Sequence, residues 1–161
     1  MNKVYHLFSQ NGDEYKLCLS TEGWPNLSSD VFSSFGLELI SVELVRIKGD
    51  AVTSSSVLTS LESIIADCFF ERHNAVLFYY CDFLNPIPSS RKTMPPQEYR
   101  SRLFSLMFER YCSHHSIKDV SEVKVVINGL DCPYYFHLIS RNSQLDSVRK
   151  IAFQLQTDFE K

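Results

Sequence analysis

The stretch that decides the fold is Asn-Ala-Val-Leu-Phe-Tyr-Tyr-Cys-Asp at residues 74–82, in which seven successive residues are apolar or aromatic. This run leaves no polar face for water, so we expect a strand that is covered on both sides. Asp82 stands where this strand is expected to end and the chain to leave the sheet. Ligands tend to bind beyond the carboxyl ends of parallel strands, so the sequence predicts a site at this junction.

The segment after Asp82 is predicted to be a long loop followed by a helix. Four prolines lie between Phe83 and Pro96, which excludes the interior of a helix or a sheet. A helical stripe then runs through residues 97–112 as Leu103, Phe104, Met107, Phe108 and Tyr111. Arg100 lies one turn before Phe104 on this stripe, whereas Arg102 is expected to point towards solvent.

A strand, a helix and a second strand form a crossover before this junction. Residues 39–47 alternate as a strand, and the hydroxyls of residues 53–56 can cap the helix that follows. Its apolar residues recur at helical spacing as far as Phe69. Such a connection between parallel strands is right-handed in nearly all proteins.

Two Asn-Gly pairs predict hairpins. Asn11-Gly12 joins strands at residues 3–9 and 14–20, and Asn128-Gly129 joins strands at residues 123–127 and 134–139. A two-residue first turn would place Phe8 opposite Tyr15 and His6 opposite Leu17. We therefore expect His6 to be packed in an apolar row and not to act as a ligand.

The element order predicts one α+β domain over residues 1–161. Residues 21–37 are irregular, with Phe32 and Phe35 expected to fold back onto the core, and Asn142-Ser143 caps a last helix. The order is β-β-β-α-β-α-β-β-α. It predicts a mixed, partly antiparallel sheet of about six strands with three helices.

Composition favours a cytoplasmic protein. No segment approaches the roughly 20 apolar residues that cross a membrane. The first residues lack the apolar core and the cleavage site of a signal peptide.

The five cysteines are scattered and contain no Cys-x-x-Cys pair, so we expect buried free thiols. Cys112, His114 and His115 are the tightest grouping of metal-ligating types, but a zinc site needs a further ligand pair. No metal is predicted.

Charge is uneven along the chain. The net charge is −3, yet residues 89–118 hold six basic residues against two acidic ones. This excess of four positive charges suggests either a basic surface or a solvated helix face. The acidic balance of the whole chain argues against nucleic acid as the partner.

Asp82 and Arg100 are the leading candidate pair. A charge on an apolar stripe is costly unless it is paired, and a carboxylate and a guanidinium can form two parallel hydrogen bonds. The pair could be a structural clasp that holds the loop. It could also be part of an anion or carboxylate pocket with Arg91 and Arg102, or the two residues could lie apart.

Enzyme motifs are missing from the sequence. The chain has five glycines, none in a phosphate-cradling turn before a helix, so nucleotide and dinucleotide cofactors are not expected. Cys81 is a poor nucleophile because the neighbouring Asp82 would raise its pKa. No cofactor is predicted, and whether the protein is an enzyme stays open.

Tyr80-Cys81-Asp82, followed by Arg-Ser-Arg-Leu-Phe at residues 100–104 and by Phe108, resembles the uncharacterised bacterial family called domain of unknown function 6169. The resemblance covers nearly the whole chain, including the first Asn-Gly hairpin, Phe69-Phe70 and Tyr134-Tyr135. Met107 replaces a usual tryptophan, and the loop after Asp82 is longer and lacks a second aspartate. The resemblance implies a fold and no established activity.

The element order is also similar to the core of the Gcn5-related acetyltransferases. In that family a glycine-rich turn grips the pyrophosphate of acetyl-CoA at the start of the crossover helix. Residues 50–55 hold the matching place here without a glycine. Tyr111 could stand in for the general-acid tyrosine of those enzymes or could pack in the core.

These observations leave three functional hypotheses. The first is a non-catalytic binding or interaction module that recognises an unknown protein or a small anionic ligand through residues 82–102. The second is an acyl-CoA-dependent N-acyltransferase-like protein, degenerate because the glycine turn is missing. The third is nucleic-acid binding through residues 89–118. A homodimer formed by strand addition to the first hairpin is a further prediction about partners.

Overall fold

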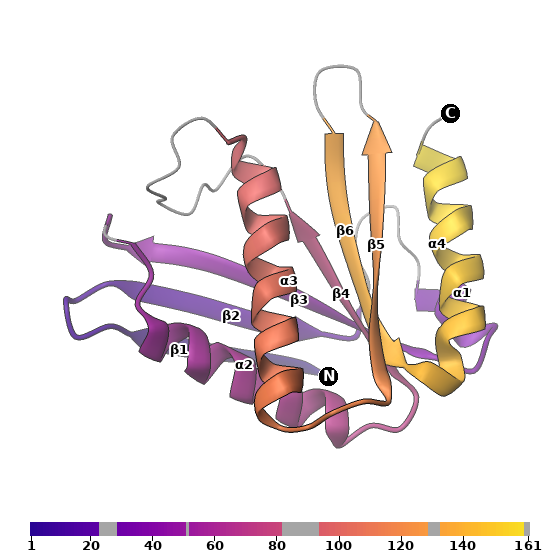
Figure 1. Cartoon of the computed structure of the whole chain (residues 1–161), viewed down its shortest axis with the longest axis horizontal. Coiled ribbons are helices and arrows are strands. Elements are labelled where there is room, and N and C mark those ends of the chain that lie inside the picture. The colour runs from indigo at the N-terminus through magenta and orange to yellow at the C-terminus, as the bar shows by residue number, and fades with distance from the viewer. Residues whose placement is uncertain (23–28, 51, 82–93, 129–132, 160–161) are drawn as a thin grey trace.

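The computed structural model describes residues 1–22, 29–50, 52–81, 94–128 and 133–159. They form one six-stranded mixed sheet with the strand order β1-β2-β3-β4-β6-β5 (Figure 1). The strands are β1 (Asn2–Phe8), β2 (Glu14–Ser20), β3 (Glu38–Lys48), β4 (Ala75–Cys81), β5 (Val120–Asn128) and β6 (Pro133–Arg141). The predicted α+β class with a mixed, partly antiparallel sheet is therefore confirmed.

Strand β4 is the buried interior strand that its sequence predicts. It pairs parallel to β3 and antiparallel to β6. Ala75, Leu77, Tyr79 and Cys81 belong to the apolar core on one face of the sheet. Val76 and Phe78 belong to the core on the other face. Both rows are mainly apolar, so both faces of the strand are covered by the cores.

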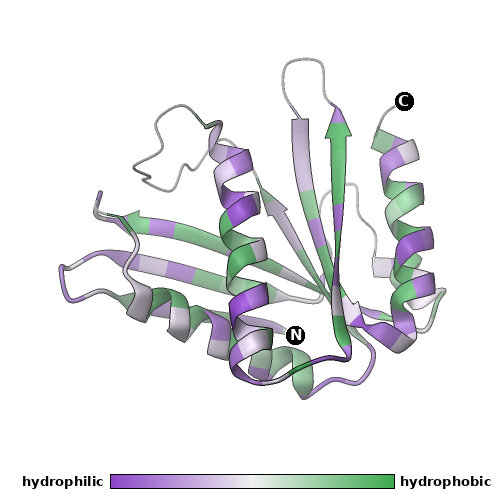
Figure 2. Ribbon diagram, in the orientation of Figure 1, coloured by the Kyte–Doolittle hydropathy of each residue, from purple (hydrophilic) through white to green (hydrophobic). Residues whose placement is uncertain are grey.

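Helices cover the two faces of the sheet. Helices α2 (Ser55–Phe70) and α3 (Pro96–His114) pack on one core, and α1 (Ser29–Ser33) and α4 (Leu145–Phe159) pack on the other. A short 3-10 turn, η1 (Asn142–Gln144), leads into α4. Figure 2 shows hydrophilic and hydrophobic residues alternating around these helices, as expected for helices that bury one side. None of the described helices is both long and apolar enough to cross a membrane.

Helix α1 was not predicted, because it has only five residues within a segment of irregular sequence. Phe32 anchors it, with its side chain fully buried against the α4 side of the sheet. The expectation that Phe35 also folds onto the core is wrong, since that side chain is exposed.

The register of the first hairpin differs by one residue from the prediction. Phe8 pairs with Glu14 and His6 pairs with Lys16. The turn is longer than two residues, because Ser9 N–H donates to the Asp13 carbonyl at 2.9 Å. A one-residue shift in register reverses the face of the sheet on which each side chain of the strand lies. His6 is consequently exposed, with Nδ1 3.2 Å from Glu14 Oε1, and is not packed in an apolar row.

Strand β1 lies at one edge of the sheet. Its outward row includes Val4 and Phe8, whose side chains are exposed. An edge strand can pair with a strand of another chain, and the homodimer stays a prediction.

Strands β3 and β4 part at their carboxyl ends. They pair from Glu38↔Ala75 to Val42↔Tyr79. Beyond that point β3 continues beside β2 to Lys48↔Glu14, while β4 continues beside β6 to Cys81↔Tyr135. Figure 1 shows the two strands diverging. We call this divergence the fork, and it opens towards the start of α3.

Candidate functional site

Arg100 and Arg102 lie on opposite sides of α3, as predicted. The Arg100 side chain faces the sheet, and the residue is 4% exposed. The Arg102 side chain is 54% exposed, and its Nη2 donates to Glu98 Oε1 at 2.8 Å, one turn earlier. Asp82 and Arg91 lie outside the described residues, so the pairing of Asp82 with Arg100 stays a prediction.

Arg100 lines a small hollow in the fork, which we call the fork cavity. Its volume is about 20 Å³. Tyr79 forms one wall and stacks on Phe104, with ring centroids 4.3 Å apart and planes 7° from parallel. The other lining residues are apolar and come from β2, β3, α2 and α3: Leu17, Val42, Leu44, Leu61, Ile65, Leu103 and Met107. Arg100 is thus the charged residue in an otherwise largely hydrophobic lining.

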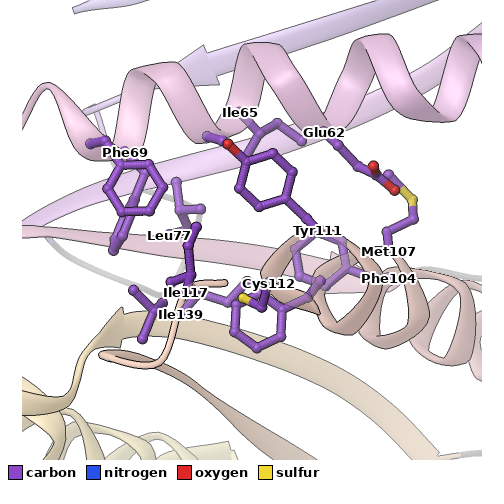
Figure 3. Close-up of a pocket in the computed structure, with 14 residues that line it drawn as sticks. Glu62, Ile65, Phe69, Leu77, Phe104, Met107, Tyr111, Cys112, Ile117 and Ile139 are labelled. Atoms are coloured by element: carbon purple, nitrogen blue, oxygen red, sulfur yellow. The ribbon is translucent and has the colours of Figure 1, made fainter. Parts of the chain in front are cut away.

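A second hollow of about 60 Å³ lies between α2 and α3, and we call it the α2–α3 groove. Figure 3 shows side chains of the two helices pointing towards one another across it, with Leu77 and Ile139 of the sheet as its floor. Ile65, Phe104 and Met107 line both this groove and the fork cavity. The two hollows are therefore neighbours that share a wall.

An ion pair marks one side of the α2–α3 groove. Arg110 Nη2 donates to Glu62 Oε1 at 2.5 Å, and the Glu62 side chain is largely buried. The pair is local to the two helices and ties α3 to α2.

Tyr111 and Cys112 also line the groove. Burial raises the pKa of Tyr111, and the neighbouring Asp67, Cys112 and Glu62 act in the same direction. Burial, followed by Asp119, raises the pKa of the Cys112 thiol. Both groups stay protonated at neutral pH. Tyr111 lies in the groove wall and packs against His115 with the two rings tilted, at 4.2 Å between ring centroids.

A buried polar network that the sequence did not reveal joins α3 to β5 and β6. Ser101 Oγ lies 2.8 Å from His137 Nε2, and His137 Nδ1 lies 3.2 Å from Glu122 Oε1. Ser105 Oγ donates to Glu122 Oε1 at 2.7 Å. Ser101 and His137 are both 0% exposed. His137 also packs edge-on against Phe104, at 5.2 Å between ring centroids.

This network stabilises the ionised form of the Glu122 carboxyl group. Burial acts to raise the pKa of its carboxyl group, but His137 and the Ser105 hydroxyl outweigh burial, and the charge of Lys124 adds to them. The net result is a pKa below the ordinary value.

The order serine, histidine, carboxylate is that of a nucleophile with its base and its orienting acid. A substrate must, however, reach the serine. Ser101 is fully buried and lines neither the fork cavity nor the α2–α3 groove. The contacts of Ser101 and Ser105 instead join α3 to His137 and Glu122 of the sheet. A histidine inside an apolar strand, opposite serines spaced one turn apart on a helix, is the signal that could have predicted it.

The remaining candidate groups do not converge on a second site. The described residues contain no group of three or more histidine, cysteine or acidic side chains placed to hold a metal ion. In the basic segment, Arg102 and Arg110 are ion-paired and Arg100 is buried. Within the described part of that segment, most of the positive charge is thus neutralised or covered.

Comparison of the chain with models of known protein families, with curated proteins and with solved structures found no match.

Proposed function

We propose that the protein is a non-catalytic binding module that holds a small anionic ligand at the fork, with Arg100 as the anchoring residue. The observation that carries the proposal is the position of Arg100 in the fork cavity. Two parallel strands diverge there, at the end of the sheet where ligands of such sheets commonly bind.

The chemistry of Arg100 supports an anion. A guanidinium has five N–H donors in a rigid plane and matches a carboxylate or a phosphate through two parallel hydrogen bonds. Arg100 is only 4% exposed, so its charge is poorly screened by water. An anion that enters the fork would therefore interact with it more strongly than with an arginine on the surface.

The positions of three candidate reactive groups support binding over catalysis. Ser101 and Cys81 are fully buried. Tyr111 has a raised pKa and belongs to the groove wall. A catalytic group must come within hydrogen-bond reach of the reacting atoms, and none of these three meets a ligand held by Arg100 in the fork cavity.

An acyl-CoA-dependent transferase is the second candidate, and the parallel crossover β3-α2-β4 with its fork favours it. Helix α2 starts with Ser54 as its cap, whose Oγ accepts from Val57 N–H at 3.4 Å. A helix start can attract a phosphate. Its first turn lacks the glycines that let the backbone approach a pyrophosphate, which weakens this candidate.

Thermal unfolding with butyrate tests the first proposal. We expect butyrate to raise the Tm of the wild-type protein and of Arg149→Gln, an exposed control on α4 that removes the same charge. Arg100→Gln should abolish the rise, and Arg100→Lys should keep part of it. No rise in the wild type, or an equal rise in Arg100→Gln, would contradict the proposal. A rise with acetyl-CoA that butyrate does not produce would favour the transferase instead.

A further inference from the structure

We infer that β1 is the interface of a homodimer, in which the β1 strands of two copies pair antiparallel and join their sheets into one. Tyr5 of each copy lies at the two-fold axis, opposite Tyr5 of the other copy. The inference goes beyond the proposed function and does not depend on it, because no residue of β1 lines the fork cavity or the α2–α3 groove.

The outer side of β1 presents backbone hydrogen-bonding groups at every second residue. At one end of the hairpin Thr21 N–H donates to the Met1 carbonyl at 3.0 Å, and at the other Ser9 N–H donates to the Asp13 carbonyl at 2.9 Å. Both bonds continue the register of β1 on β2. In an antiparallel pair, residues that bond to the partner strand alternate with residues that do not. The odd-numbered residues of β1 therefore bond to β2, and the N–H and C=O groups of the even-numbered ones point outwards. Among the described strands, only β2 pairs with β1.

Apolar side chains at this edge are incompletely covered on both faces of the sheet. Tyr5 and Leu7 lie on the face that α2 covers and are only partly buried there. Side chains alternate along a strand, so Val4 and Phe8 lie on the other face. They are 53% and 67% exposed. A further strand paired with β1 would cover part of both rows.

One register lets β1 pair with a second copy of itself along its whole length. It sets Asn2 opposite Phe8 and Val4 opposite His6, so that outward-facing groups meet outward-facing groups. Each such pair exchanges two hydrogen bonds, which gives about eight across the interface. A shift by one residue would set these groups against residues that already bond to β2. A shift by two residues would shorten the overlap.

The side chains of two copies are compatible in this register. Lys3 lies opposite Leu7 of the other copy, so like charges are not opposed, and the lysine stem can cover the leucine. On the other face, Val4 lies diagonally beside Val4 and Phe8 of the other copy, within reach of side-chain contact. The exposed apolar residues of the two edges thus meet in one patch. A second copy is therefore the partner that fits this strand.

The other edge of the sheet, β5, is less suited to pairing with itself. Asn142 N–H donates to the Asp119 carbonyl at 2.7 Å, so by the same alternation the even-numbered residues of β5 face outwards. Full antiparallel overlap of two β5 strands would oppose Lys124 to Lys124, which is unfavourable. Gln156 Nε2 of α4 also donates to the outward-facing carbonyl of Val126 at 3.4 Å. The comparison favours β1 as the edge that pairs.

Sedimentation equilibrium tests the interface with a matched pair of variants. The wild type should form a dimer whose fraction rises with concentration. Val4→Lys puts a charge at an exposed, outward-facing position, where it would lie opposite His6 and beside its own copy. This variant should be a folded monomer, by circular dichroism, at concentrations where the wild type is dimeric. Val126→Lys makes the same change at an exposed, outward-facing position of β5 and should dimerise as the wild type does.

Disulfide cross-linking tests the register. The two copies of position 5 face each other as a pair without hydrogen bonds, with Cα atoms roughly 4.5 Å apart. A disulfide spans about 4.4–6.8 Å between Cα atoms, so Tyr5→Cys should yield a covalent dimer under mild oxidation. Leu7→Cys, on the same face, should not, because the two copies of position 7 lie about 14 Å apart along the strands. The wild type, with its native thiols, is the blank.

Each outcome decides the inference without reference to butyrate binding. A dimer that Val4→Lys abolishes and Val126→Lys keeps supports the interface, and cross-linking of Tyr5→Cys supports the register. A wild-type monomer at the highest attainable concentration overturns the inference and leaves the edge to a different protein. Dimerisation that survives Val4→Lys, or that Val126→Lys abolishes, overturns it as well. Cross-linking of Leu7→Cys in place of Tyr5→Cys overturns the register.

Discussion

Val42 and Tyr79 are the last residues that pair strands β3 and β4. Beyond them the two strands follow different neighbours, and α3 crosses the opening with Arg100 turned inwards. One break in pairing thus places Arg100 in the lining of a largely apolar hollow. The position of Arg100 has consequences for stability as well as for binding.

Removal of Arg100 should be costly. Arg100→Ala is expected to lower the free energy of unfolding by about 3–5 kcal/mol, because it would leave the carboxylate that we predict as the partner of this buried charge unpaired. Arg102→Ala, two residues away, removes an exposed pair and should cost no more than about 1 kcal/mol. Urea denaturation of both variants checks the difference. A cost below about 0.5 kcal/mol for Arg100→Ala would show that its charge is not held inside the fold.

The buried network predicts an effect of Ser101. Ser101→Ala leaves His137 Nε2 buried without its partner, which should cost about 1–3 kcal/mol in the free energy of unfolding. Ser113→Ala, at an exposed position near the end of the same helix, is the control and should change stability by less than about 0.5 kcal/mol. Similar urea midpoints for the two variants would mean that the Ser101 contact contributes nothing.

Acid should weaken the fold through Glu122. The pKa of Glu122 is lowered in the folded state, so its contribution is present above the unfolded pKa of about 4.3. The contribution is lost as the pH falls through the lower folded pKa. Urea unfolding between about pH 6 and pH 3 should show a shallower acid decline for Glu122→Gln than for the wild type. Glu109→Gln, at an exposed position, should follow the wild-type curve, and parallel curves for all three proteins would refute the assignment.

Gly49 should tolerate substitution less well than Gly36. Both have positive φ, at 102° and 70°, so alanine at either position carries a backbone cost of about 1–2 kcal/mol. A Cβ at Gly49 would also lie 1.6 Å from Asp13 Oδ1, whereas one at Gly36 would meet nothing within 4 Å. In thermal unfolding, Gly49→Ala should have a lower Tm than Gly36→Ala. Equal Tm values would show that Asp13 moves aside freely.

Much of this architecture could be predicted from local patterns. The uninterrupted apolar run of β4, the stripes of α2 and α3, and the opposite orientations of Arg100 and Arg102 each follow from the periodicity of one segment. The binding segment at residues 82–102 was predicted on the same basis. Only residues 94–102 of this segment, mostly the start of α3, fall within the described residues.

Features that depend on contacts between segments could not be predicted in this way. The register of β1 on β2 depends on a turn closed by Ser9 and Asp13, whose hydrogen bond is not visible in the Asn-Gly signal. The Ser101–His137 contact joins residues 36 positions apart. The fork depends on where β3 changes from two partners to one, and no residue marks that point in the sequence.

The most direct measurement is an NMR titration that follows the side-chain Nε–H resonances of Arg100 and Arg102 as butyrate is added. The Nε atom of Arg100 is buried, and the Arg102 side chain is exposed on the other side of the same helix. If Arg100 anchors the anion, its resonance should show a saturable shift while that of Arg102 stays in place. An unmoved Arg100 resonance at saturating butyrate, or equal movement of both, would contradict the proposed function.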